Sequence, residues 1–151
     1  MSDWGQDDYD DPDTAEGGDE MSGEEPELYY ESVDEFVREY LRHVYKRRID
    51  GCHRCWAGQW WRYDEAVIRL EALWRAWEHL RQDPATGMSI WFRDHADHHM
   101  PALMDPDGPF AGATDGEENT CKKGEPLPYV APPEGVFVDV REHTTAGSRR
   151  L

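Results

Sequence analysis

Two cysteines near the middle of the chain have the spacing of half a zinc site. The stretch reads CHRC from Cys52 to Cys55, and two thiolates at this spacing commonly bind one Zn²⁺ ion. Because no second CxxC follows, the remaining ligands would have to be histidines, and the candidates are His95, His98 and His99. The alternative is a pair of reduced cysteines in an ordinary loop. We expect no bound metal or cofactor.

A second group of polar side chains lies at residues 93–99, which read RDHADHH. Asp94 lies beside His95, and such a pair could act as a general base. His95 and His99 are four residues apart, as in helical metal-binding pairs. However, the chain has no HExxH motif, no nucleophile beside this cluster and no phosphate-binding loop. We therefore expect no enzymatic activity. Ion pairs that fix a helix junction are the favoured interpretation, and a recognition surface is the alternative.

The elements that position these groups are predicted to be helices. Six of the seven tryptophans lie from Trp56 to Trp91, in or beside a long amphipathic stretch at residues 59–80. Spacings of three and four place its apolar residues on one helical face. These are Tyr63, Ala66, Val67, Leu70, Leu73, Trp74, Trp77 and Leu80.

An earlier helix is predicted to begin at Ser32, which with Glu35 fits a capping box, and to end at Gly51. Its last turn would contain the cations of residues 46–48, which suit the negative end of a helix dipole. We expect Trp74 and Trp77 to be buried against its apolar face, which comprises Phe36, Tyr40 and Val44.

The rest of the chain is predicted to contain two short helices, one capped by Ser89 and one by Asp97, then a linker at residues 111–125 and an extended proline-rich segment at residues 126–140. That segment could dock on the helices or on a partner. The predicted fold is a small all-α domain of two long antiparallel helices plus two short ones. Its boundaries are a disordered acidic arm at 1–28, the helical domain at 29–110, and a linker and extended tail at 111–151.

Charge is distributed unevenly along the chain. Residues 1–35 contain fifteen acidic residues and no lysine or arginine, although the net charge of the whole chain is −17. General nucleic-acid binding needs a net positive surface to release counterions, so this composition weighs against it. No apolar run is long enough to cross a bilayer, so we expect no membrane partner. Three cysteines do not suggest a disulfide framework, and we expect a cytoplasmic protein.

Two surfaces are candidates for binding a partner. The first is a polar and aromatic surface formed by Trp60, Trp61, Trp91, Arg93, Asp94 and His95. The second is a basic ridge of Arg38, Arg42 and Lys46, which are spaced by four residues on one helical face. This ridge could be an ordinary solvated face, or it could bind the acidic arm of the chain or a phosphate-bearing partner.

Several long motifs resemble one protein family. They are YxSVxEFV from Tyr30, WWR from Trp60, RLEALWRAWEHLR from Arg69, DPxTGMS from Asp83, WFRDHADHHM from Trp91 and DPDGPF from Asp105. Together they are similar to the actinobacterial domain-of-unknown-function family 4913 over about residues 29–112. The resemblance implies no established activity, and it implies a setting of mobile elements or conjugation. Family members tend to have cysteine where this chain has Ala57, and often proline where it has His98.

The function predicted from these observations is a non-enzymatic adaptor or accessory protein that binds another protein in such a setting. The first alternative is a nucleic-acid-associated accessory protein that uses the basic ridge together with Arg47 and Arg48. The second is a small zinc-stabilised protein.

Overall fold

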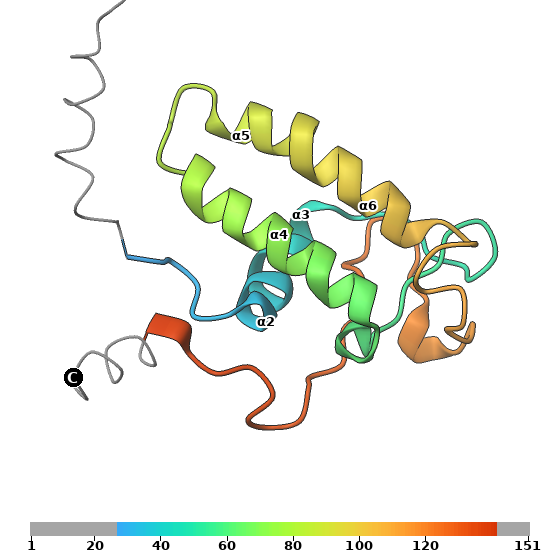
Figure 1. Ribbon diagram of the computed structural model, residues 1–151. Coiled ribbons are helices and arrows are strands. Elements are labelled where there is room, and N and C mark those ends of the chain that lie inside the picture. The colour runs from blue at the N-terminus through green and yellow to red at the C-terminus, as the bar shows by residue number, and fades with distance from the viewer. Residues whose placement is uncertain (1–26, 142–151) are drawn as a thin grey trace, which may run out of the picture.

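The computed structural model describes residues 27–141, which form an entirely helical fold without a β-strand among them (Figure 1). The acidic arm predicted at 1–28 lies outside the described residues except for its last two, as does the end of the tail from residue 142. The α-helices are α2 (Val33–Phe36), α3 (Arg42–Val44), α4 (Asp64–Leu80), α5 (Gly87–Ile90) and α6 (Asp97–Met104). The other helical segments are η3 (Val37–Leu41), η4 (Trp60–Arg62), η5 (Trp91–Ala96) and η6 (Glu117–Asn119).

The first helical run joins α2, η3 and α3 without a break, and it begins where the sequence predicts. The hydroxyl of Ser32 accepts the N–H of Glu35 at 3.2 Å, and the Glu35 carboxylate accepts the N–H of Glu31 at 2.7 Å. The first bond satisfies a donor that a helix N-terminus leaves without a partner, and the second fixes the residue before the cap. The central part, η3, is π-helical. The predicted end at Gly51 is wrong, because the run stops at Val44 and residues 46–48 lie outside any helix.

The core is built around α4, whose tryptophans are buried as expected. Trp74 is 1% exposed and Trp77 is 8% exposed. The ring of Trp77 lies 5.7 Å from that of Phe36 and 5.0 Å from that of Tyr40, so the predicted packing of the two helices is confirmed for these residues. The predicted burial of Val44 is wrong, because this side chain is 40% exposed at the end of the first helical run.

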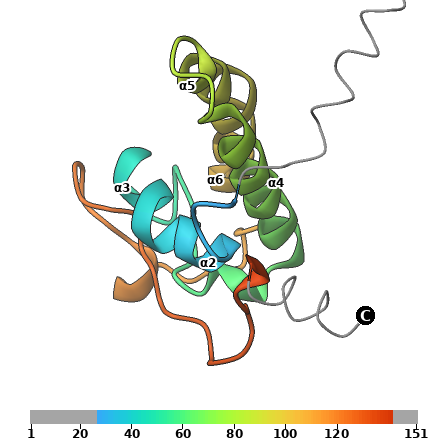
Figure 2. The same ribbon diagram turned by 90° about the vertical axis from the view of Figure 1, so that its left-hand side faces the viewer.

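The two short helices predicted after α4 are one continuous run that joins α5, η5 and α6 and lies alongside α4 (Figures 1 and 2). The run begins at Gly87 rather than at a Ser89 cap. Asp97 does not cap a new helix, because its carboxylate accepts the hydroxyl of Tyr45 at 3.0 Å. Pro101 lies inside α6, in the α-helical turn that follows the π-helical segment η5.

The segment at residues 126–140 docks on the helices of its own chain. Leu127 is fully buried, and its N–H donates to the carbonyl of Arg42 in the first helical run at 3.1 Å. Further along, the N–H of Val130 donates to the carbonyl of Gly58 at 2.9 Å, and Phe137 stacks on Trp60 at 5.4 Å. Of the two possibilities left open by the sequence, docking in cis is the one observed.

Residues 111–125, predicted as a linker, also contact the core. Asn119 is buried in η6, and its side-chain oxygen accepts the N–H of Gly58 at 2.8 Å. A β-carbon on Gly58 would lie 2.5 Å from the carbonyl oxygen of Glu118, so a larger residue does not fit there. The packed unit therefore continues past residue 110.

Candidate functional site

In the stretch between α3 and η4, three exposed cations at residues 46–48 lie between two buried residues, Tyr45 and Ile49. Tyr45 is buried at the end of α3, and Ile49 is 1% exposed. Ile49 pairs with Cys121 through two backbone bonds, one in each direction, at 3.0 and 3.1 Å. Since its two ends are fixed in this way, the segment exposes the side chains of residues 46–48 to solvent.

The following turn is organised by the carboxylate of Asp50. This carboxylate accepts the backbone N–H groups of residues 52–54 at 2.8–3.2 Å and the ring N–H of His53 at 2.8 Å. It also pairs with Arg48 at 2.9 Å. The side-chain bond with His53 and then the backbone bonds hold the pKa of Asp50 well below its usual range. Gly51 has a φ of 78°, a conformation that suits glycine, so the turn has one well-defined shape.

These loops line an open hollow of about 340 Å³ that we call the basic hollow. Its lining consists of five cationic residues and one glycine, and no carboxylate contributes to it. The six residues are Lys46, Arg47, Arg48, Arg54, Lys123 and Gly124. The cations come from three separate parts of the sequence. Arg54 is held in place by a bond from its guanidinium to the carbonyl of Arg48 at 3.2 Å.

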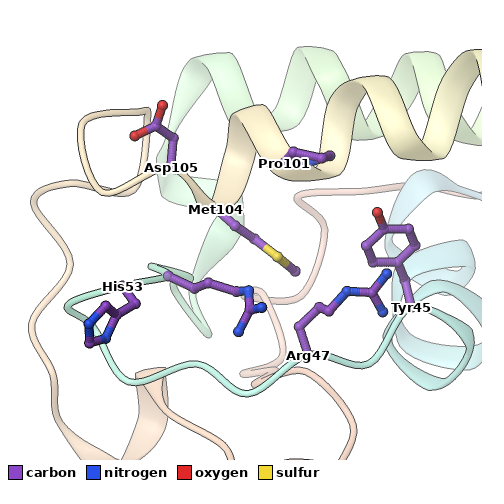
Figure 3. Close-up of a pocket in the computed structure, with 7 residues that line it drawn as sticks. Tyr45, Arg47, His53, Pro101, Met104 and Asp105 are labelled. Carbon is purple, nitrogen blue, oxygen red and sulfur yellow. The ribbon is translucent and has the colours of Figure 1, made fainter.

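A second hollow of about 210 Å³ adjoins the first and shares Arg47 and Arg54 with it. Figure 3 shows the side chain of Arg47 reaching toward the ring of Tyr45, and the guanidinium carbon lies 4.2 Å from the ring centroid. Met104 lines the same hollow from the end of α6, and Asp105 lies on the far side from Arg47 (Figure 3). This hollow offers an apolar wall next to the cations.

The aromatic surface predicted from the sequence is largely interior. Trp60 and Trp91 are fully buried, so placing them on a binding surface was wrong. The indole N–H of Trp61 donates to the carbonyl of Val130 at 2.9 Å. The polar edge of Trp61 therefore binds the C-terminal segment and is not available to a partner. Arg93 and Asp94 are exposed and pair with each other at 2.7 Å, which lowers the pKa of the Asp94 carboxyl.

The predicted ridge is divided between two roles. Arg38 pairs with Asp34 at 3.0 Å, and Asp34 also accepts the hydroxyl of Tyr129 at 2.6 Å. Arg42 donates to the carbonyl of Leu127 at 2.9 Å. These two arginines therefore fasten the C-terminal segment, whereas Lys46 belongs to the basic hollow.

The candidate metal ligands are not brought together. Among the described residues, no group of three or more histidine, cysteine, aspartate or glutamate side chains is arranged to hold a metal ion. Cys52 is exposed and Cys55 is buried, and burial raises the pKa of the Cys55 thiol. His95 is half-buried in η5. His99 lies 3.0 Å from a guanidinium nitrogen of Arg69, and burial followed by this charge lowers its pKa.

A family model for a domain of unknown function, DUF4913, matches residues 30–133, which is more than half of the chain. The chain belongs to this family. The match extends beyond the helices to include both loops that line the basic hollow and the start of the docked C-terminal segment. No curated protein and no solved structure matches the chain. Within residues 27–141, no helix is both long and apolar enough to cross a membrane.

Two members of the basic hollow were missed by sequence reasoning. In the sequence, Arg54 is an interior residue of the CHRC stretch, and Lys123 belongs to the predicted linker at residues 111–125. The signal that could have found them is the placement of short basic runs, residues 46–48 and 122–123, in an otherwise acidic chain. That they share one site depends on the Ile49–Cys121 pairing, which no local pattern reveals.

Proposed function

We propose that this protein is a non-enzymatic interaction protein that binds an acidic segment of another protein in its basic hollow. The observation that carries this proposal is a hollow lined by five cationic side chains and no carboxylate, in a chain with a net charge of −17. Such a concentration of like charge is costly for a folded protein and is compensated when an anion binds.

The groups around the hollow suit recognition better than chemistry. A thiol nucleophile needs a lowered pKa, whereas desolvation raises the pKa of both Cys55 and Cys121. The His53 ring is engaged by the Asp50 carboxylate in the adjoining turn. Arginine and lysine side chains, in contrast, bind carboxylates and phosphates without any further group.

A short acidic segment fits this surface better than a nucleic-acid duplex. Residues 27–141 contain 21 acidic and 14 basic residues, so they have a net charge of −7 despite the basic hollow. Screening confines the attraction of the hollow to about 10 Å at moderate salt. A long polyanion would extend past this range onto acidic surface, whereas a short segment would not. We propose that the partner belongs to the mobile-element setting implied by the family resemblance.

The test is binding of a labelled acidic dodecapeptide, measured by fluorescence anisotropy at low salt. Because the chain's own eleven carboxylates at residues 1–26 would compete with the probe, all eleven are neutralised by Asp→Asn and Glu→Gln substitution, which gives the arm-neutral variant. Introducing Arg47→Glu with Arg54→Glu should weaken binding at least tenfold. The control pair Arg62→Glu with Arg93→Glu makes the same charge change at exposed positions outside the hollow and should alter affinity less than twofold.

Equal weakening by the two pairs would show that only net charge matters and would overturn the site. A single-stranded 12-nucleotide DNA of similar charge serves as the comparison probe. Tighter binding of this DNA, with an affinity that falls steeply as salt rises, would replace the protein partner with a nucleic acid.

A further inference from the structure

We infer that residues 1–26 of the chain occupy the basic hollow when no partner is bound, so that the protein competes with its own ligand. This inference rests on the proposed function, because it assigns an occupant to the same site. Residues 1–26 contain eleven acidic residues and no lysine or arginine. They have the chemistry that the hollow is built to bind.

The hollow is the favoured destination because most arginines elsewhere on the described surface already pair with a carboxylate, whereas Arg42 and Arg62 bond to the Leu127 carbonyl and to Gln59. Five arginines outside the hollow each pair with a carboxylate of the same or the preceding helical turn or of an adjacent residue. The pairs are Arg38–Asp34, Arg69–Glu65, Arg75–Glu71, Arg81–Glu78 and Arg93–Asp94, at 2.7–3.3 Å. By comparison, Arg48 is the one cation of the hollow that has an ion pair with a carboxylate in the part of the chain that the structure describes.

The arm is long enough to reach the hollow. Its last residue adjoins Glu27, whose carbonyl accepts a guanidinium N–H of Arg81, just beyond the C-terminal end of α4. The 17 residues of α4 correspond to a helix of about 26 Å. A chain of 26 residues can span at most roughly 90 Å, which exceeds the distance across a domain of this size. Covalent attachment gives a tethered ligand an effective concentration in the millimolar range.

A tethered competitor sets a threshold for the partner. An acidic segment that binds weakly cannot displace residues 1–26 at micromolar concentration, whereas a denser anionic segment can. The arm would in this way prevent adventitious binding of the many weakly acidic surfaces in a cell. It would also leave the hollow occupied in the isolated protein.

The experiment compares the full-length wild-type chain with the arm-neutral variant. The dodecapeptide should bind the arm-neutral variant about tenfold more tightly than it binds the wild type, and the difference should be independent of protein concentration. A labelled synthetic peptide of residues 1–26 should bind the arm-neutral variant. That binding should weaken at least tenfold in the Arg47→Glu/Arg54→Glu background and less than twofold in the Arg62→Glu/Arg93→Glu background.

The possible failures are distinguishable. Equal affinity of the wild type and the arm-neutral variant for the dodecapeptide overturns the inference and leaves the proposed function standing. Binding of the 1–26 peptide without binding of the dodecapeptide overturns the proposed function and supports occupation by the arm. A difference that grows with protein concentration indicates that the arm reaches a second copy, and it overturns occupation in cis.

Discussion

One buried carboxylate, that of Glu78 on α4, joins the start of the described chain to the core. The residue is 4% exposed, and its carboxylate accepts the backbone N–H groups of Tyr29 at 2.8 Å and Tyr30 at 2.9 Å. It also accepts the indole N–H of Trp74 at 2.9 Å and pairs with Arg81 at 3.1 Å. Removing this carboxylate should therefore destabilise the fold through several donors at once.

The expected cost of Glu78→Ala can be worked out from these contacts. The N–H of Tyr30 and the indole N–H of Trp74 would remain buried without acceptors, at about 1–3 kcal/mol each. Alternatively, the chain could swing away so that both donors meet water. That would expose the ring of Tyr30, which is buried against Trp77 at 5.2 Å, at a cost of about 2 kcal/mol. The first route costs about 2–6 kcal/mol in total and the second about 2 kcal/mol, so we expect a loss of about 2–3 kcal/mol in the free energy of unfolding.

Urea denaturation followed by far-UV circular dichroism measures this loss. With a denaturant slope of about 2 kcal/mol/M, the midpoint should fall by about 1–1.5 M. The control is Glu71→Ala, which removes an ion pair with Arg75 whose side chains are both more than 40% exposed, and should change the stability by less than about 0.5 kcal/mol. Glu78→Gln, which keeps one acceptor oxygen, should fall between the two. Midpoints of the two alanine variants that agree within error would refute the role assigned to the buried carboxylate.

Two further predictions concern the docked C-terminal segment. Leu127→Ala should lower the free energy of unfolding by about 2–5 kcal/mol because the side chain is fully buried, whereas Val138→Ala at a 53% exposed position should have little effect; equal effects in thermal unfolding would argue that the segment does not dock. Tyr129→Phe removes a 2.6 Å bond to Asp34, and burial with this bond raises the pKa of Tyr129 to about 12. Since the folded pKa is above the unfolded value, the contribution of the protonated hydroxyl is full below about pH 10 and is lost toward pH 12. Denaturation curves should therefore show the wild type losing more stability than the variant across that window, and parallel losses would contradict the assignment.

The parts of the fold that the sequence predicted correctly depend on local interactions. The helical spacing of the apolar residues in α4 identified the face that buries Trp74 and Trp77. Ser32 was recognised as a helix cap because its partner Glu35 is only three residues away. Both patterns can be read within two or three turns of helix, where intrinsic preference and packing act in the same direction.

The errors arose where distant residues decide the outcome. The first helical run ends early because Ile49 pairs with Cys121, 72 residues further along the chain, and this pairing requires an extended backbone. Asp97 has the character of a helix cap, but the hydroxyl of Tyr45 binds its carboxylate and the helix continues through it. A preference worth about 1 kcal/mol, such as that of a capping residue, is easily overridden by such tertiary contacts.

The division of the predicted basic ridge explains why the hollow depends on the C-terminal segment. In a helix that continued to Arg48, the side chains of Arg42 and Lys46 would lie one turn apart on a single face. Instead, Arg42 forms two hydrogen bonds with Leu127, and Cys121 pairs with Ile49 through backbone hydrogen bonds. Lys122 and Lys123 lie in the chain between Cys121 and Leu127. The docking that fixes these two residues therefore also places Lys123 beside Lys46 and the other cations of the hollow. A chain whose C-terminal segment came loose would expose a different set of cations, and the basic hollow would no longer exist.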